Sequence, residues 1–476
     1  MESFKVGNIK SFVDSGEIEI KPLTILIGKN SCGKSSLIRF PIVLKQTVQE
    51  NISPLLFYGK LIDYGNYEDV IFNHEESNDV NFQLNFETRQ LKQALFLFVG
   101  PRSYRESDFL DYLKKYEKVS VNLNIGRKMH NEKFWGDLEV KDFSLEVGDQ
   151  EIFRCYKTEQ KKYKIKLLDK DYSEDVEVQF SGFFPIIEIN RRINSNNVDE
   201  IGENNLLLIR GISIAIEKLV MTSMEEVSYI GPFRRTPERN YRFQEANLLS
   251  IGADGEYTSE LLASYYRKND VEFFKKLNDW LQQHLNIHIN VEELKGGIYR
   301  VLVKDLKSGI INNIRDVGFG LSQVLPIVVQ VLIQKDNEGR NIRAKNRLQR
   351  VLKRINIFEQ PELHLHPAAQ SSLADLFILG HELDSRNHFF IETHSEHLIL
   401  RLRRRILEGR INPDHVAIYF VQKSENSSGY SCVEKLNLNE NGDIENWPED
   451  FFDQDFQEII EINKLRSKGI EGEFEW

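Results

Sequence analysis

The sequence contains 476 residues, of which 41% are hydrophobic, so the chain can bury a core large enough for two or three ordinary domains. Its net charge of -11 disfavours non-specific attraction to nucleic acid, so any such contact requires a local basic patch. Three widely separated cysteines suit a reducing cytosol, and since no apolar stretch approaches the length of a membrane span, we expect a cytoplasmic protein without membrane contact.

The first half of the chain begins with a strand pattern. The apolar run over residues 23–27 predicts a buried strand that ends at Gly28, and a helix is expected from about Ser35. Between about residues 66 and 190, short alternating segments separated by turn residues predict antiparallel strands.

The second half of the chain is richer in helical patterns. Apolar residues recur at helical spacing over 204–223 and 257–285. From about residue 314 to 420 the pattern is helix, strand, helix, strand, helix, which is typical of a mostly parallel sheet covered by helices. We therefore expect an α/β fold.

A phosphate-binding loop is predicted between the first buried strand and its helix. Residues 28–36, GKNSCGKSS, match the pattern G-x-x-x-x-G-K-[ST] in the strand-to-helix context that makes the motif specific. Glycines let backbone N–H groups point at phosphate oxygens, the lysine neutralises charge, and the serine hydroxyl binds Mg²⁺. The candidate residues for ATP are Gly28, Lys29, Asn30, Ser31, Cys32, Gly33, Lys34, Ser35 and Ser36, with Ser35 also a Mg²⁺ ligand. Cys32 is either a small residue tolerated in the loop or a redox switch.

Two later strands end in polar residues that are expected beside the same phosphates. The apolar run 355–358 leads to Glu359 and Glu362, so carboxylates emerge where a strand ends and where Mg²⁺ needs a ligand. The run 389–391 leads to His394 at the end of another strand. Taken alone, an E-x-x-E segment near a proline is usually a turn, and a histidine after a strand is more often a surface or core residue with its own partners.

The order of these motifs resembles that of ABC-type ATPases, and in particular the structural-maintenance-of-chromosomes-like branch near the overcoming-lysogenization-defect ATPases. The likeness covers roughly residues 1–70 and 310–425. It implies an ABC-type head in which Lys34 contacts phosphate, Glu359 is the Walker B acid and a Mg²⁺ ligand, and His394 senses the γ-phosphate.

The resemblance also assigns a signature motif to residues 317–323, VGFGLSQ, which would reach the ATP of a partner subunit. Glycines there allow close backbone approach, whereas the alternative is a glycine-rich helix start. The implied ATP-contacting residues are Gly318, Gly320, Ser322 and Gln323.

Gln360 departs from the family pattern, because the general-base glutamate normally stands at this position. An amide cannot accept a proton from water as a carboxylate does. We expect slow hydrolysis, with Glu362 or His394 positioning the water, or a protein that uses ATP chiefly to hold a dimer. The catalytic candidates are Lys34, Glu359, Gln360, Glu362 and His394.

The expected organisation follows from these motifs. The N- and C-terminal segments form one ATPase head, and a β-rich and helical segment is inserted between them. The expected parts are residues 1–65 with the phosphate loop, 66–230 as a β-rich insertion, 231–310 as a helical segment, 311–425 as the second part of the head, and 426–476 as a strand with an acidic and aromatic tail.

The resemblance implies an ATPase that forms a homodimer or higher oligomer through its heads and gates a separate effector, a nuclease or toxin, as in prokaryotic antiphage systems such as Septu and PARIS. One alternative is an ATPase for DNA repair or chromosome maintenance. Another is an ATP-gated scaffold with little turnover, which Gln360 favours.

Several clusters leave two interpretations open. Basic residues over 340–354 and 401–405 either contact DNA or RNA or form solvated helix faces. The segment 231–243 either brings Arg234 or Arg235 to a nucleotide or partner subunit or is a solvated turn.

Two further patterns are interpreted as structural. His364 and His366 share a face of an extended segment, but no third ligand lies at a zinc spacing. The pairs Asp169/Asp171 and Asp453/Asp455 have a spacing seen in nuclease sites, and we interpret both as turns.

Overall fold

The computed structural model describes residues 1–100, 108–130, 133–160, 162–189, 200–243, 250–333, 344–424 and 429–448. A six-stranded sheet forms the centre of the fold, in the order β13-β18-β19-β4-β20-β21. All neighbouring pairs are parallel except β20 and β21. The strands are β13 (Val227–Ile230), β18 (Arg354–Glu359), β19 (Asn387–Glu392), β4 (Leu23–Gly28), β20 (Val416–Lys423) and β21 (Ser431–Leu436). The predicted α/β class is confirmed.

The three central strands β4, β18 and β19 are buried along their whole length, as expected for parallel strands covered on both faces. Successive side chains point to opposite faces, so Ile357 and Phe390 join one hydrophobic core while Phe358 and Phe389 join the other. Helices α1 (Lys34–Ile38) and α2 (Phe40–Glu50) contribute to the first core, and α9 (Phe319–Leu332), α11 (Pro367–Leu383) and α12 (Glu396–Leu407) to the second.

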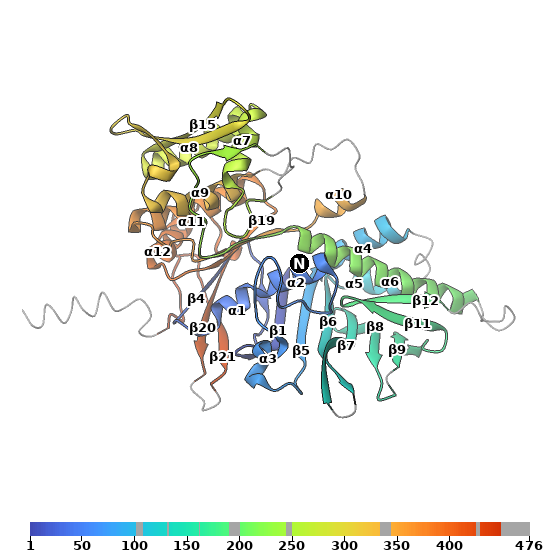
Figure 1. Ribbon diagram of the computed structural model, residues 1–476. Helices are drawn as coiled ribbons and strands as arrows, with labels where there is room; N and C mark the ends of the chain where they lie inside the picture. The colour runs from blue at the N-terminus through green and yellow to red at the C-terminus, as the bar shows by residue number, and fades with distance from the viewer. Residues whose placement is uncertain are drawn as a thin grey trace, which may run out of the picture.

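A nine-stranded antiparallel sheet contributes its buried side chains to the first core and starts at the beginning of the chain (Figure 1). Strand β1 pairs with β5 in the register Phe4 to Leu84, so the expected division at residue 65 separates strands of one sheet. The strands are β1 (Ser3–Ile9), β2 (Phe12–Asp14), β3 (Ile18–Glu19), β5 (Val80–Glu87), β6 (Lys118–His130), β7 (Lys133–Val147), β8 (Gln150–Lys157), β9 (Tyr163–Leu167) and β10 (Lys170–Asp171).

Helices and a hairpin pack around this antiparallel sheet. The long helix α6 contacts α2 and the hairpin of β11 and β12, and its apolar face belongs to the first core. The elements are α3 (Tyr67–Val70), α4 (Thr88–Ala94), α5 (Asp108–Lys115), β11 (Val176–Ser181), β12 (Phe184–Ile189), α6 (Glu200–Glu225) and α10 (Ala344–Gln349).

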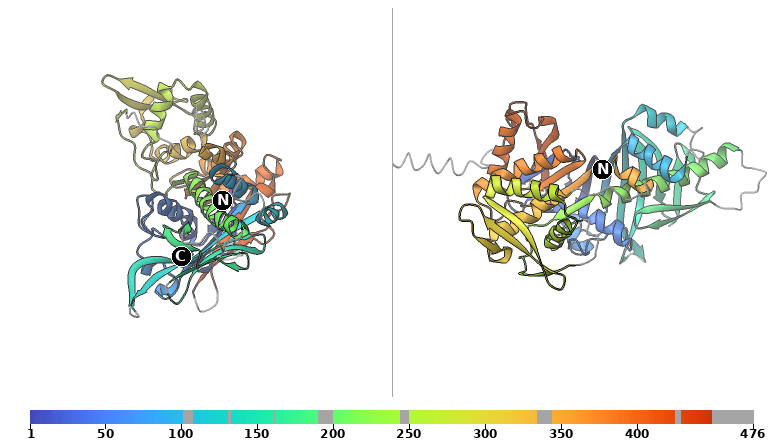
Figure 2. Two further views of the ribbon diagram at one scale, coloured as in Figure 1. Left: turned by 90° about the vertical axis from the view of Figure 1, so that its right-hand side faces the viewer. Right: turned by 90° about the horizontal axis from the view of Figure 1, so that it is seen from above.

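The segment expected to be helical over 231–310 also contains strands, which form a four-stranded sheet with β17. Figures 1 and 2 show this part beyond α9, at the opposite end of the molecule from β7 to β9. The elements are β14 (Tyr241–Arg242), α7 (Thr258–Arg267), α8 (Val271–Leu285), β15 (Ile287–Leu294), β16 (Ile298–Asp305) and β17 (Ile311–Asn313). Across the described residues, no helix is both long and apolar enough to cross a membrane.

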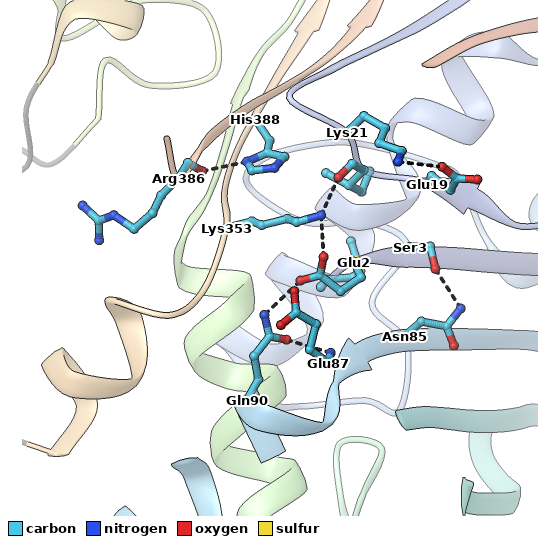
Figure 3. Close-up of polar contacts among 12 residues, drawn as sticks. Glu2, Ser3, Glu19, Lys21, Asn85, Glu87, Gln90, Lys353, Arg386 and His388 are labelled. Carbon is cyan, nitrogen blue, oxygen red and sulfur yellow. Dashed lines mark hydrogen bonds and ion pairs between the residues drawn. The ribbon is translucent and has the colours of Figure 1, made fainter. Parts of the chain in front are cut away.

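A polar network joins the two large sheets beside the start of β18 (Figure 3). Lys353, just before β18, forms an ion pair with Glu2 at 2.5 Å and donates to the carbonyl oxygen of Ile20 at 2.6 Å. Gln90 donates to the same Glu2 carboxylate at 2.9 Å. The network fixes the start of β18 against β1 and α4.

His388 on β19 lies near this network and is buried. Its Nδ1 lies 2.9 Å from the carbonyl oxygen of Arg386. Burial, and to a lesser extent the charge of Lys353, lowers the pKa of His388 from 6.5 to about 3. The folded protein therefore holds this imidazole neutral at every pH above about 3.

We expect acid destabilisation that depends on His388. In the unfolded chain His388 binds a proton as the pH falls below 6.5, whereas in the folded chain it stays neutral until the pH approaches about 3. The free energy of unfolding therefore falls as the pH is lowered between these two values. Between pH 7 and pH 5 the loss is about 2 kcal/mol. Urea unfolding at the two pH values should show a smaller difference for His388→Asn than for wild type. The same change at the exposed His364 should leave the difference intact, and equal pH dependence in all three proteins would contradict the prediction.

Candidate nucleotide-binding site

The phosphate loop connects β4 to α1 and has the backbone that the motif requires. Gly28 has a φ of 147°, and a Cβ there would lie 2.1 Å from the carbonyl oxygen of Val421. Gly33 has a φ of 94°, in the left-handed region that glycine adopts without strain. The buried Lys34 folds back into the loop, where its Nζ donates to the carbonyl oxygens of Gly28 at 2.9 Å and Lys29 at 2.7 Å. A cation is therefore held at the centre of the loop.

A pocket of about 420 Å³ opens in front of this loop. Its walls include Gly33, Lys34 and Ser35 of the loop, together with Glu392 at the end of β19. Lys10, Asn73 and His74 also line the pocket, from two other segments of the first part of the chain. Backbone N–H groups, a lysine and a hydroxyl facing one pocket suit a polyphosphate.

Glu359, the expected Walker B acid, is held by two neighbours. Arg39, the residue between α1 and α2, donates through Nε and Nη2 to its two carboxylate oxygens, each at 2.6 Å. The Tyr229 hydroxyl of β13 donates to Oε1 at 2.6 Å. The Glu359 residue is only 2% exposed, so Arg39 compensates a buried charge. Its role as a Mg²⁺ ligand stays a prediction.

Glu392 is the carboxylate nearest to the loop serine. Because β19 lies between β18 and β4, Glu392 is in register with Glu359 on one side and Leu26 on the other. Ser35 donates from Oγ to Glu392 Oε1 at 2.9 Å, and Oε2 has no hydrogen-bond partner among the described residues. Burial, followed by the charge of Glu359, raises the pKa of Glu392 to about 7.

The remaining catalytic candidates surround the end of β18. Gln360 has a φ of 43°, and its backbone N–H donates to the Glu392 carbonyl oxygen at 2.8 Å. Glu362 accepts the backbone N–H of His394 at 2.6 Å, and burial raises the pKa of Glu362. Burial and then Lys34 lower the pKa of His394 to about 4, so its imidazole is neutral at pH 7. The structure thus places Lys34, Glu359, Gln360, Glu362 and His394 around one end of the sheet.

Arg234 resolves one open alternative, because it is not part of a solvated turn. It is 5% exposed and donates to the carbonyl oxygens of Glu359 at 2.9 Å and Gln360 at 3.2 Å. Burial lowers its pKa to about 10, which leaves it charged at pH 7. Arg235 instead is exposed and pairs with Asp254. The Arg234 guanidinium therefore holds the loop in which Gln360 lies.

The expected signature residues lie at the start of α9. Gly318 is the N-cap and is exposed, whereas Ser322 and Gln323 are buried. Gln323 donates to the Arg234 carbonyl oxygen at 3.4 Å. Ser322 lines a second hollow of about 260 Å³, which shares no described wall residue with the pocket at the phosphate loop. Within one chain, Ser322 and the phosphate loop therefore line different hollows.

The other clusters have structural partners. Arg401 and Arg405 both pair with Asp375, Arg403 pairs with Asp443, and Arg404 pairs with Glu408. These ion pairs neutralise much of the basic patch on α12. Residues 340–343 of the other basic cluster lie outside the described residues.

The histidine and aspartate patterns have local roles as well. His366 caps α11 by accepting from the Ala368 N–H. Within the described parts of the chain, no group of three or more His, Cys, Asp or Glu side chains could hold a metal ion. Asp169 lies in a turn as predicted, whereas Asp171 ends β10 and accepts from the Ser173 N–H. Asp453 and Asp455 lie outside the described residues.

Sequence reasoning missed three residues of the site: Arg39, Tyr229 and Glu392. Arg39 and Tyr229 are part of no motif, and only the packing of α1 and β13 on β18 brings them to Glu359. The sequence could have indicated Glu392, because this residue ends a buried strand two residues before His394. Its position beside Ser35 depends on the strand order, which the sequence does not state.

Strand β4 leads through the phosphate loop to α1, and β18, which ends in Glu359, lies on the far side of β19 from β4. This arrangement defines a P-loop nucleotide-binding protein. Residues 1–399 match the AAA ATPase domain family, and the chain belongs to this family. The P-loop is thus that of an ATPase. Residues 411–462 match a protein family of unknown function (DUF3696).

Similar solved structures include three heads of structural-maintenance-of-chromosomes proteins. An Smc head bound to the C-winged helix domain of ScpA is 11% identical, with a TM-score of 0.41 over 92% of this chain and 98% of that chain. The SMC head domain from Thermotoga maritima is 10% identical, with a TM-score of 0.38 over 92% and 98%. An Smc head with an extended coiled coil, bound to the C-terminal domain of ScpA derived from Pyrococcus furiosus, is 11% identical, with a TM-score of 0.38 over 97% and 99%. No curated protein matches the chain.

We expect the Arg39–Glu359 pair to be essential for stability. Arg39→Met leaves a buried carboxylate without its cation and should lower the free energy of unfolding by about 2–4 kcal/mol. The double variant Arg39→Met with Glu359→Gln should lose less free energy of unfolding than the two single variants lose together, because Glu359→Gln removes the uncompensated charge. Urea unfolding of the double-mutant cycle measures this coupling.

The matched control is Arg89→Met, which removes the exposed ion pair of Arg89 with Glu87. This change should cost no more than about 1 kcal/mol. A loss of the same size for Arg39→Met and Arg89→Met, with additive effects in the cycle, would show that the buried pair contributes nothing special.

Proposed function

We propose that this ATPase binds ATP with Mg²⁺ at the phosphate loop and uses it to join two heads of the same chain. The observation that carries the proposal is the pocket of about 420 Å³, in which Lys34, Ser35 and Glu392 line one wall. Lys34 is buried at the centre of the loop and lines the pocket, so a small movement of its ammonium group would bring it to a bound phosphate. The hydroxyl and carboxylate oxygens fit Mg²⁺, which prefers oxygen ligands. In proteins Mg²⁺ usually leaves several of its coordination positions to water and phosphate.

Bound Mg²⁺ would neutralise phosphate charge and polarise the γ-phosphoryl group. The chain's own residues would do the rest. Lys34 binds phosphate oxygens, and the neutral His394 offers a ring nitrogen for a hydrogen bond at the end of β19. Gln360, held by Arg234, orients a water molecule through its amide but takes no proton from it.

Two separate hollows support a head-to-head dimer. Gly318, the N-cap of α9, is exposed and does not line the phosphate pocket of its own chain. In the dimer that we propose, each α9 start would complete the phosphate pocket of the partner. The proposal extends to gating of a separate nuclease or toxin effector in antiphage defence, a role supported by the motif resemblance.

Gln360 favours a second candidate function, an ATP-gated scaffold with little turnover. A head that binds ATP but hydrolyses it slowly would hold the dimer for long periods. The two candidates differ in the rate of hydrolysis and not in the geometry of binding.

We expect slow ATP turnover that Gln360→Glu raises by at least about tenfold, because a carboxylate can accept the proton of the attacking water. Lys34→Ala should abolish ATP binding. Phosphate release and ATP binding by calorimetry, with and without DNA, measure both effects. The exposed Lys60 provides the control, since Lys60→Ala should change neither. Fast wild-type turnover that Gln360→Glu does not increase would contradict the scaffold, and stimulation by DNA would support a repair ATPase instead.

We expect Gly318→Asp to prevent ATP-dependent dimerisation while leaving ATP binding by the single chain intact. No atom lies within 4 Å of a Cβ at this position, and its φ of -53° suits any residue, so the fold should be preserved. The added carboxylate would oppose the phosphates of the partner's ATP. Light scattering with and without ATP measures the mass. The matched control Gly318→Asn has the same size without the charge and should still dimerise, whereas an ATP-dependent dimer of Gly318→Asp would contradict the proposed arrangement.

A further inference from the structure

Two buried carboxylates stand side by side at the end of the parallel sheet. Glu359 on β18 and Glu392 on β19 are register partners, and each residue is 2% exposed. Two like charges this close and this buried oppose each other unless a cation compensates them. Among the described residues, Glu359 forms an ion pair with Arg39, whereas Glu392 lies within the electrostatic influence of Lys34 and Arg39 without an ion pair to either.

Arg39 compensates the charge of Glu359. The Arg39 guanidinium donates to both carboxylate oxygens of Glu359 at 2.6 Å, and Oε1 also accepts from the Tyr229 hydroxyl at 2.6 Å. A bidentate ion pair of this kind is strong and directional. To bind Mg²⁺ directly, Glu359 would have to give up at least one of these charge-assisted bonds.

Glu392 has a different set of neighbours. Its Oε1 accepts from Ser35 Oγ at 2.9 Å, and its Oε2 has no hydrogen-bond partner in the described part of the chain. Glu392 lines the phosphate pocket, whereas Glu359 does not. In the P-loop motif the hydroxyl of this serine is a Mg²⁺ ligand.

The spacing of the two oxygens also fits a cation. Adjacent ligands of an octahedral Mg²⁺ ion with bonds of about 2.0–2.1 Å are separated by about 2.9 Å. Ser35 Oγ and Glu392 Oε1 are 2.9 Å apart. A Mg²⁺ ion bound by both oxygens in place of this hydrogen bond, with the hydroxyl hydrogen turned away from Glu392, would need little movement of either side chain.

We propose that Glu392, and not the Walker B acid Glu359, supplies the protein carboxylate that holds Mg²⁺ next to Ser35, directly or through a bound water. Glu359 then serves a positioning role, because its ion pair with Arg39 fixes the end of β18 relative to the phosphate loop. This inference rests on the proposed binding of ATP with Mg²⁺.

The test compares Glu392→Gln with the matched change Glu359→Gln in the full chain. ADP affinity is measured by calorimetry with Mg²⁺ and with EDTA, so that hydrolysis plays no part. In wild type, Mg²⁺ should tighten binding. Glu392→Gln should reduce this gain by about 10- to 100-fold, the range that such metal-site changes usually cost, while affinity in EDTA is kept. Glu359→Gln should keep the Mg²⁺ gain, and Glu392→Asp should restore part of it.

Mn²⁺ provides a second readout. The electron paramagnetic resonance spectrum of Mn²⁺ with ADP and wild-type protein should show a bound ion, and the bound fraction should fall in Glu392→Gln at equal ADP occupancy. This comparison stays informative if one variant is less stable, because occupancy is measured on the same sample.

Several outcomes would overturn the proposal. One is a Mg²⁺ gain kept in Glu392→Gln and lost in Glu359→Gln. Another is a gain kept in both while Glu392→Gln loses ATP turnover, which would make Glu392 a general base. Wild type that binds ADP equally well with Mg²⁺ and EDTA would also overturn it, while leaving nucleotide binding in place. Wild type that binds no nucleotide at all would overturn the proposed function itself.

Discussion

The bidentate contact between Arg39 and Glu359 is the interaction on which the rest of the site depends. It joins the helices that follow the phosphate loop to the strand that carries the acidic residues, across 320 positions of sequence. Because both partners are largely withdrawn from water, the pair resists separation more than a surface ion pair does. The pair therefore fixes the end of β18 relative to the phosphate loop, although Glu359 itself does not line the pocket.

The order of the parallel strands decides which side chains share this edge of the sheet. Strand β19 lies between β18 and β4, so its last residue, Glu392, faces the phosphate loop, and the next turn carries His394. Carboxyl ends of parallel strands meet at one edge, which is where α/β proteins bind their ligands. The same burial that keeps His394 neutral raises the pKa of Glu362 and Glu392, so the edge holds less negative charge than its residue types suggest.

The loop after β18 is held in an unusual conformation that bears on turnover. Gln360 has a positive φ, its N–H is bonded to the strand beside it, and Arg234 holds its carbonyl oxygen. These contacts fix the backbone of Gln360 at the end of β18. Such a fixed backbone suits the role that we propose for Gln360, the orientation of a water molecule.

The local features of the protein follow from short stretches of its amino-acid sequence. The phosphate loop, the buried strands β4, β18 and β19, and the helices α6, α7, α8 and α12 each have a pattern of a few neighbouring residues, and such patterns act through local backbone preferences and burial. The strand pattern between residues 66 and 190 was also predicted, but not that β1 starts the same sheet. Other features are long-range and exist only in the folded chain: the place of Glu392 beside Ser35, the contact of Arg39 and Tyr229 with Glu359, and the burial of Arg234. These depend on strand order and on helix packing, which arise from contacts between residues far apart in the chain and therefore have no local pattern to reveal them.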